Sequence, residues 1–377
     1  MDLIKSIPFN KPYFSGKEID YIYEAVQSGK ISGDGIFTRK CQIFFEERYG
    51  FLKSLLTTSC TDALEMSAIL CNIKPGDEII APSYTFVSTV NAYVLRGAKI
   101  VFVDSEFATP NIDVSLIEDL ISSRTKAIIP VHYAGISCKM DTIMDIANRY
   151  KLFVVEDAAQ AIDSFYKNKP LGSIGHFGTF SFHETKNVIS GEGGMLVVND
   201  ERFLDRAEII REKGTNRSAF FRGEIDKYGW VDIGSSFLPS EIISAFLYAQ
   251  LENLLSIQKR RLEIWRLYYD QLKPLEGTIR LPTIPHDTTN NAHMFYIVCR
   301  SLDERTRLIE YLGKHNIMAV FHYLPLHSSP FYRSRHDGRK LPNSEYFGDC
   351  LLRLPLYFNL SNSDVIRISK TILDYFR

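Results

Sequence analysis

The chain has 377 residues, which is long for one hydrophobic core and sufficient for two domains. Its apolar fraction of 45% and charged fraction of 24% are those of a soluble globular protein, and its net charge of −1 excludes a general attraction to nucleic acid or anionic membranes. No run approaches the roughly 18 apolar residues of a membrane-spanning helix. The six scattered cysteines lack metal-ligand spacing. We therefore expect a cytoplasmic protein with reduced thiols, no metal site and neither nucleic acid nor membrane as partner.

Seven short apolar runs lie between Leu55 and Asp200 and predict strands: "SLLTT", "DEIIAPS", "AKIVFVD", "TKAIIPVHYAG", "LFVVEDAA", "GTFSFH" and "GGMLVVND". Between several of them, helical patterns cover residues 61–71, 115–121 and 140–150. Strands that alternate with helices predict an α/β fold with a mostly parallel sheet covered on both faces. In such sheets, ligands bind at the carboxyl ends of the strands.

A different organisation follows the last of these strands. Residues 214–236 form a long polar and aromatic stretch, which we interpret as a functional loop. One long helix is predicted over residues 240–272. Past Pro274, "NAHMFYIVCR" predicts a strand and "DERTRLIEYLGKHN" a helix. We therefore predict a large domain of residues 1–272 and a smaller C-terminal α+β domain of residues 273–377.

The first candidate for chemistry is the predicted helix start in "TTSCTDALEM". Ser59 or Thr61 can cap the helix, and the charge of Asp62 suits its first turn. Free backbone N–H groups at a helix start bind anions. A plain capped helix is the alternative interpretation.

Two further candidates are an acidic strand end and a lysine. The strand "LFVVEDAAQA" ends at Glu156 and Asp157, and a carboxylate buried there needs a cationic partner unless it only caps the next helix. Lys186 stands between the strand "TFSF" and the glycine-rich "SGEGG". A buried lysine has a lowered pKa and can form a Schiff base, whereas a solvated loop lysine is the alternative.

Taken together, these three sites match one cofactor. Pyridoxal phosphate (PLP) requires a phosphate-binding helix start, an acid beside its pyridine nitrogen and an amine that forms a Schiff base. The acid keeps the ring nitrogen protonated, so the ring can withdraw electrons from the substrate. The sequence therefore predicts a PLP-dependent enzyme.

The motifs "PSYTFVST", "PVHYAG", "VVEDAAQA", "FSFHETKN" and "GEGGML", in this order, resemble the DegT/DnrJ/EryC1/StrS sugar-nucleotide aminotransferases. The similarity extends from "IPFNKPYFSGKE" to "LLRLPLYFNLS". The resemblance implies a fold-type I PLP-dependent transferase, with a mostly parallel seven-stranded sheet between helices and a smaller C-terminal α+β domain. It also implies a homodimer with active sites at the subunit interface.

By position in these motifs, Lys186 matches the Schiff-base lysine and Asp157 the acid at the pyridine nitrogen. Gln160 matches a residue near the ring hydroxyl, and Phe86 matches the aromatic residue that stacks on the ring. The remaining cofactor-binding residues implied by the resemblance all face the phosphate: Thr61, Asp62, Ser181 and Ser236. Ser236 replaces an asparagine that many members contribute from the other subunit.

The segments "SGDGIFTRKCQ", "REKGTNRSAFFRGEIDKY", "NAHMFYI" and "MAVFHYLPLH" resemble members that make dTDP-4-amino-4,6-dideoxy-D-galactose. The implied substrates are dTDP-4-keto-6-deoxy-D-glucose and L-glutamate, and the implied role is bacterial surface polysaccharide biosynthesis. The substrate-binding candidates are Arg217, Arg222, His322, Tyr323 and His327. Solvated charges are the alternative for the arginines, and a core or surface position is the alternative for His327.

Two other functions stay open at this point. The first is formation of the dTDP-4-amino-4,6-dideoxy-D-glucose epimer from the same ketosugar. The second is a non-catalytic regulatory protein on the same scaffold. Some relatives replace the lysine with histidine and no longer transaminate, so the presence of Lys186 favours transamination.

Overall fold

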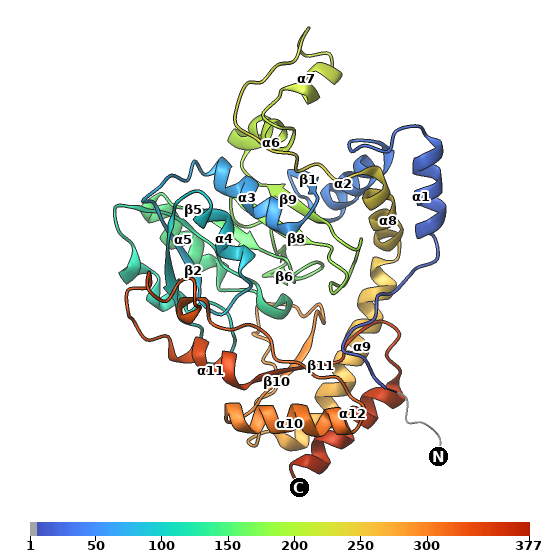
Figure 1. Cartoon of the computed structure of the whole chain (residues 1–377), viewed down its shortest axis with the longest axis vertical. Coiled ribbons are helices and arrows are strands. Elements are labelled where there is room, and N and C mark those ends of the chain that lie inside the picture. Colours follow the sequence, from blue (N-terminus) through green and yellow to red (C-terminus); the bar gives the residue numbers. More distant parts are fainter. Residues whose placement is uncertain (1–5) are drawn as a thin grey trace.

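The computed structural model describes residues 6–377 and contains a central seven-stranded sheet (Figure 1). Its strand order is β1-β9-β8-β5-β4-β2-β3. The strands are β1 (Lys53–Thr57), β2 (Glu78–Pro82), β3 (Lys99–Val103), β4 (Thr125–Ile128), β5 (Phe153–Asp157), β8 (Phe177–Ser181) and β9 (Gly194–Val198). Each overlaps one of the seven predicted apolar runs, so the strand predictions are confirmed.

The sheet is mostly parallel, as predicted. Strands β3, β2, β4, β5 and β8 pair in parallel, whereas β9 runs antiparallel to both β8 and β1. Every residue of β2 and β9 is buried. Strands buried on both faces read as continuous apolar runs, which is why the sequence pattern did not alternate.

Helices cover both faces of the sheet, and each face has its own hydrophobic core. On one face, Ile80 of β2 packs in a cluster with residues of α2 (Ile36–Tyr49) and α5 (Met140–Tyr150). On the other face, Ile79 packs with residues of α3 (Cys60–Leu70), α4 (Ser88–Val94) and α6 (Leu204–Arg211). Successive strand residues point to opposite faces, so one strand supplies both cores. The first helix, α1 (Glu18–Gln27), packs against α8 (Glu241–Glu252).

Two helix predictions are wrong. Residues 115–121 form no α-helix but two short 3-10 helices, Val114–Leu116 and Glu118–Leu120. Their backbone N–H groups bond carbonyl oxygens three residues earlier rather than four, as that of Leu120 does to Ile117 at 3.0 Å. The single helix over residues 240–272 is two helices, α8 and α9 (Leu254–Leu272). At Asn253 between them, the side chain donates a hydrogen bond to the carbonyl oxygen of Ala249 at 3.1 Å and thereby competes with the helical backbone.

The C-terminal part contains a two-stranded antiparallel sheet of β10 (Phe295–Val298) and β11 (Leu351–Leu354). The helices α10 (Leu302–Lys314), α11 (Pro342–Cys350) and α12 (Asn362–Tyr375) accompany it at the foot of Figure 1. Helix α9 joins the two parts, because Leu254 belongs to a core of the large sheet and Tyr268 to the C-terminal core. The domain division after residue 272 stays a prediction.

The predicted functional loop contains one short helix, α7 (Arg217–Phe221), and projects from the rest of the chain at the top of Figure 1. A small hairpin of β6 (Phe165–Tyr166) and β7 (Lys169–Pro170) lies after β5. Among residues 6–377, no helix combines the length and apolar character that crossing a bilayer requires.

Candidate active site

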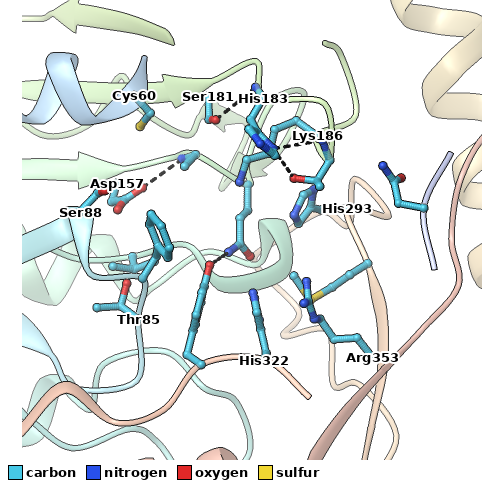
Figure 2. Close-up of a pocket in the computed structure, with 18 of the residues that line it drawn as sticks. Cys60, Thr85, Ser88, Asp157, Ser181, His183, Lys186, His293, His322 and Arg353 are labelled. Atoms are coloured by element: carbon cyan, nitrogen blue, oxygen red, sulfur yellow. Dashed lines mark hydrogen bonds between the residues drawn. The ribbon is translucent and has the colours of Figure 1, made fainter. Parts of the chain in front are cut away.

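A cavity of about 680 Å³ lies at the carboxyl ends of β5 and β8 (Figure 2). Both parts of the chain line it. The sheet part contributes the starts of α3 and α4 and the ends of the two strands, and the C-terminal part closes the opposite side. Among the lining residues are Cys60, Thr61, Phe86, Ser88, Asp157, Gln160, Ser181, Lys186, His293, His322, Tyr323 and Arg353.

The start of α3 forms one wall of this cavity. Ser59 caps the helix by accepting a hydrogen bond from the backbone N–H of Asp62 at 3.1 Å. Thr61 donates from its hydroxyl to Ser88 Oγ at 2.9 Å, which ties the starts of α3 and α4 together. The partial positive charge of a helix start favours an anion here. Asp62 does not line the cavity in the described chain, because its N–H serves the cap and its carboxylate accepts a hydrogen bond from Thr58.

Asp157 presents a buried carboxylate to the cavity at the end of β5. The Thr89 hydroxyl donates to Oδ2 at 2.7 Å, and the backbone N–H of Ala159 donates to Oδ1 at 3.2 Å. The neighbouring Glu156 points the other way, because successive strand residues alternate between faces. Its carboxylate is fully buried and bonds His132 Nε2 at 2.9 Å. Only one of the two predicted acids therefore faces the cavity.

Lys186 follows β8 in a turn, where its backbone N–H donates to the carbonyl oxygen of His183 at 2.9 Å. Its side chain lines the cavity. Burial lowers the pKa of the Lys186 amine from its ordinary value of 10.5, while Cys60 and Asp157 act in the opposite direction. A lowered pKa leaves more of the amine uncharged and available as a nucleophile or base.

A hydrogen-bond network joins the two parts of the chain across the cavity. Gln160 Nε2 donates to the Tyr323 hydroxyl at 2.9 Å and its Oε1 accepts from the backbone N–H of Ala134 at 2.6 Å. Tyr323 stacks on His322, whose Nδ1 shares a hydrogen bond of 2.7 Å with the Tyr133 hydroxyl. Burial lowers the pKa of His322 well below its ordinary value, so this ring is neutral at pH 7. These contacts fix how the C-terminal part closes the cavity.

Phe86 lines the cavity with 55% of its surface exposed. Its ring centroid lies 6.1 Å from that of Tyr323. An exposed large aromatic side chain at the mouth of a cavity can cover a planar ligand. Ser181, at the end of β8, also lines the cavity.

Sequence reasoning missed two basic residues of this site. His293 Nδ1 shares a hydrogen bond of 2.9 Å with Asn187 Oδ1, and burial lowers the pKa of His293 well below its ordinary value. Arg353 lies within β11. A charged residue in the middle of the apolar run "LLRLPL" was the signal that could have identified Arg353.

Besides Asp62, four further predicted residues do not line this cavity in the described chain. Arg217, Arg222 and Ser236 line a second cavity beside α6 and α7, where Arg222 forms ion pairs with Glu208 and Glu224. His327 is buried, and its Nδ1 shares a hydrogen bond of 2.7 Å with Ser83 Oγ while its Nε2 faces Glu345 at 3.2 Å. The binding roles of these four residues stay predictions.

The donor set of the main cavity fits PLP. Lys186 supplies an amine of lowered pKa, and the start of α3 offers a favourable place for a phosphate. The Asp157 carboxylate accepts two hydrogen bonds in the structure and has lone pairs left for a third from a ring N–H. Gly194 allows β9 to approach this wall closely, because a Cβ atom there would lie 2.3 Å from the backbone nitrogen of Cys60.

Comparison with known proteins places the chain in a family. The model of the DegT/DnrJ/EryC1/StrS aminotransferase family matches residues 12–373. An uncharacterized protein of Methanocaldococcus jannaschii is 37% identical over 97% of this chain and 96% of its own length, and GDP-perosamine synthase of Escherichia coli O157:H7 is 33% identical over 99% of both. A solved Streptococcus pneumoniae chain, named a sugar aminotransferase and in its PLP form, has a TM-score of 0.89, 27% identity and 97% coverage of both chains. The chain therefore belongs to the DegT/DnrJ/EryC1/StrS aminotransferase family and is a PLP-dependent sugar aminotransferase.

Proposed function

We propose that the protein transfers the amino group of L-glutamate to C4 of dTDP-4-keto-6-deoxy-D-glucose, giving dTDP-4-amino-4,6-dideoxy-D-galactose and 2-oxoglutarate. The observation that carries transamination is the meeting of Lys186 and Asp157 in one cavity. The resemblance of residues 214–236 and of the C-terminal segments to enzymes with this product supports the choice of sugar. The product would serve bacterial surface polysaccharide biosynthesis, of the enterobacterial common antigen or O-antigen type.

In this proposal, PLP when bound withdraws electrons and makes the C–H bond beside the amino group acidic. Lys186 binds the cofactor and moves the proton, because its lowered pKa keeps part of the amine uncharged. Asp157 holds a negative charge at the inner wall, where Thr89 and Ala159 fix its orientation. Gln160 orients the cofactor ring from one side, and Phe86 covers the cavity mouth and excludes water.

The phosphate would lie at the start of α3, within reach of the hydroxyls of Thr61 and Ser181. Asp62 would act through the helix start that its backbone N–H helps to cap. His322 and Tyr323 would contact the sugar from the C-terminal side of the cavity. His327 would keep that side in place through Ser83 rather than through a sugar contact.

We further propose a homodimer in which Ser236, Arg217 and Arg222 serve the cavity of the other subunit. The loop of residues 214–236 projects from the chain in Figure 1. Its Trp230 side chain is 84% exposed. An exposed tryptophan on a projecting loop favours a contact with a second copy.

The test is an NMR analysis of what the purified protein makes from dTDP-4-keto-6-deoxy-D-glucose, PLP and L-glutamate. Small proton couplings at C4 would show the axial amine of the galacto product. Large couplings would show the gluco epimer and refute the proposed stereochemistry. Absence of any aminated sugar would refute the substrate.

A GDP-linked 4-keto-6-deoxysugar is the matched second substrate, because one relative with 33% identity is named GDP-perosamine synthase. We expect the ratio kcat/KM to be higher for the dTDP-linked sugar. A higher ratio for the GDP-linked sugar would reverse the nucleotide assignment and leave the reaction type unchanged.

The regulatory alternative is tested by Lys186→Ala in cells that depend on the protein. We expect loss of the amino sugar from surface polysaccharide. Full biological activity of this variant would contradict the enzymatic proposal.

A further inference from the structure

His293 lies on the cavity wall and takes no part in the proposed transfer of the amino group. Its side chain is buried and lines the cavity. The ring bonds Asn187, the residue that follows Lys186 in the chain, and Figure 2 shows His293 on the same side of the cavity as Lys186. A substrate group that contacts His293 is therefore close to the carbon that reacts beside Lys186.

A backbone carbonyl group fixes the orientation of the Asn187 side chain. Its Nδ2 atom lies 2.8 Å from the carbonyl oxygen of Asn291, which can only accept a hydrogen bond. The second hydrogen of Nδ2 goes to Gln258 Oε1, also at 2.8 Å. The side-chain oxygen of Asn187 therefore faces His293, where it lies 2.9 Å from Nδ1.

This contact decides which ring nitrogen of His293 carries the hydrogen. An amide oxygen can only accept, so the hydrogen is on Nδ1. Burial lowers the pKa of His293 well below its ordinary value, and the charges of Lys186 and Arg261 act in the same direction, so the ring is neutral at pH 7. Within residues 6–377, the bond to Asn187 is the only hydrogen bond of the ring. Nε2 is thus a bare acceptor that a ligand can use.

An unprotonated ring nitrogen needs a hydrogen-bond donor, and few atoms of the proposed substrates supply one. The carboxylates of L-glutamate and the phosphates of the sugar nucleotide only accept, and the amino group of L-glutamate is the group that reacts. The ketosugar has hydroxyl groups that can donate. Of the two ring carbons beside C4, C3 carries a hydroxyl group and C5 a methyl group. The acceptor near Lys186 therefore matches the C3 hydroxyl.

Tyr323 offers a donor that complements this acceptor. Gln160 Oε1 accepts from the backbone N–H of Ala134, so Nε2 is the atom that donates to the Tyr323 oxygen at 2.9 Å. The hydroxyl hydrogen of Tyr323 has no acceptor among residues 6–377, and Tyr323 lines the cavity. A sugar hydroxyl both donates and accepts. A cavity with one bare acceptor and one available donor therefore suits a hydroxylated substrate.

We propose that His293 accepts a hydrogen bond at Nε2 from the C3 hydroxyl of the sugar and thereby selects ketosugars with a hydroxyl group beside the carbonyl carbon. Asn187 is the positioning residue, because it keeps the hydrogen on Nδ1. This inference deepens the proposed function and rests on amination at C4. It does not rest on the nucleotide, because the GDP-linked 4-keto-6-deoxysugar carries the same hydroxyl.

The test compares dTDP-4-keto-6-deoxy-D-glucose with its 3-deoxy analogue at saturating L-glutamate. We expect the wild-type kcat/KM to be about 10- to 100-fold higher for the sugar that has the hydroxyl. His293→Phe keeps a ring but has no acceptor, and it should abolish this preference. His293→Gln keeps an acceptor and should retain part of it. Equal kcat/KM values in the wild type, or a full preference in His293→Phe, would overturn the proposal.

His315→Phe is the matched control. Like His293, His315 bonds an oxygen acceptor through Nδ1, here the carbonyl oxygen of Tyr311 at 2.8 Å. It is exposed and does not line the cavity. We expect its preference between the two sugars to equal that of the wild type.

A hydrogen bond from the Lys186 amine to His293 is the competing role. The half-reaction of the PLP-loaded enzyme with L-glutamate needs Lys186 but no sugar, and the absorbance of the cofactor follows it. We expect His293→Phe to slow amination of the sugar at least about 10-fold more than it slows this half-reaction. Equal losses in both would assign His293 to Lys186 and overturn the proposal.

The tautomer is tested without turnover by ¹⁵N NMR of protein with labelled histidines, because the chemical shift of a ring nitrogen depends strongly on whether it carries hydrogen. We expect the His293 signals, identified by their loss in His293→Phe, to show hydrogen on Nδ1 and none on Nε2 at pH 7. Asn187→Leu should give a mixture of tautomers and a weaker preference between the sugars. Hydrogen on Nε2 in the wild type would overturn the proposal. If His293→Phe does not fold, His293→Gln identifies the signals.

Failure of the proposed function gives a different result. If the enzyme prefers a GDP-linked sugar, the comparison is made with that sugar and its 3-deoxy analogue, and the expected preference is the same. A wild type that aminates no 4-ketosugar would refute the proposed function and the assignment to the C3 hydroxyl with it. The ¹⁵N spectra would still decide the tautomer of His293.

Discussion

At the scale of single residues, the site depends on the different surroundings of two adjacent acids, Glu156 and Asp157. Glu156 and Asp157 are adjacent, yet the alternation of a strand sends one into the core and the other into the cavity. Glu156 accepts hydrogen bonds from the backbone N–H groups of Gly172 and Gly175. Asp157 is oriented instead by the side chain of Thr89 on α4. The hydrogen bonds of each carboxylate therefore hold Glu156 in the core and Asp157 at the cavity.

Thr89→Val removes the hydroxyl that donates to Asp157 and keeps the shape of the side chain. We expect kcat to fall about 10-fold, because a hydrogen bond to a charged group is worth roughly 1.5 kcal/mol or more. The rate of sugar amination measures this. Thr371→Val in α12 is the control, since its hydroxyl donates only to the carbonyl oxygen of Arg367. An unchanged kcat in Thr89→Val would show that Asp157 is oriented without Thr89.

Lys186 should also make the stability of the cofactor-free protein depend on pH. Its pKa in the folded state lies below the ordinary value of 10.5, so between these two values the unfolded chain binds more protons. Lys186 therefore lowers the free energy of unfolding at pH 7, and this destabilising effect disappears as the pH rises to 10.5.

Lys186→Met should accordingly unfold at a higher urea concentration than the wild type at pH 7. We expect this difference to shrink as the pH approaches 10.5. Equilibrium unfolding of both cofactor-free proteins across this range measures it. Lys169→Met, at an exposed lysine, is the control. A difference that does not change with pH would contradict the lowered pKa.

At the scale of elements, the site depends on how closely β9 approaches the start of α3. At Gly194, a Cβ atom would lie 2.2 Å from the carbonyl carbon of Ser59 and 2.3 Å from the nitrogen of Cys60. Both are backbone atoms, so the contact could be relieved only by moving a strand or a helix. Gly194, which follows the turn that holds Lys186, therefore sets the geometry of the proposed phosphate site.

Gly194→Ala should lower both stability and PLP affinity. We expect a loss of about 1–3 kcal/mol in the free energy of unfolding, which is typical of overpacking, and weaker retention of PLP on dialysis. Gly313→Ala near the end of α10 is the matched control, because nothing lies within 4 Å of its added Cβ. The control should be neutral or slightly stabilising. Equal PLP retention in both variants would show that β9 and the start of α3 can move apart without weakening PLP binding.

At the scale of the whole molecule, the two parts of the chain form one site but leave some predicted residues outside it. Asp157 ends strand β5 and Lys186 lies in the turn after β8, whereas His322 and Arg353 come from the C-terminal part. The network of Gln160, Tyr323 and His322 holds the two sides together. Arg217, Arg222 and Ser236 lie at a separate cavity, which is what the proposed homodimer would explain.

Trp230→Ser tests this proposal of a homodimer. We expect the wild type to elute as a dimer in light-scattering chromatography and the variant to dissociate at a concentration at least about 10-fold higher than the wild type does. Leu255→Ser, at another exposed apolar residue outside the loop, is the control. A monomeric wild type would refute the dimer, and an unaffected variant would place the interface elsewhere.

Local patterns in the sequence were enough to predict the strands, the α/β class and the cofactor, and they named Lys186 and Asp157 as the candidate catalytic pair. Apolar runs of five residues and the polar strand ends at Asp157 and Lys186 are local signals, because burial and strand period act on neighbours in the chain. The break at Asn253 escaped prediction because the apolar pattern continues across it. The folded chain was needed to show that Thr89 orients Asp157, that Arg353 reaches the cavity, and that Arg217 and His327 lie elsewhere. These contacts join residues far apart in sequence, and no local pattern encodes which distant surfaces the fold brings together.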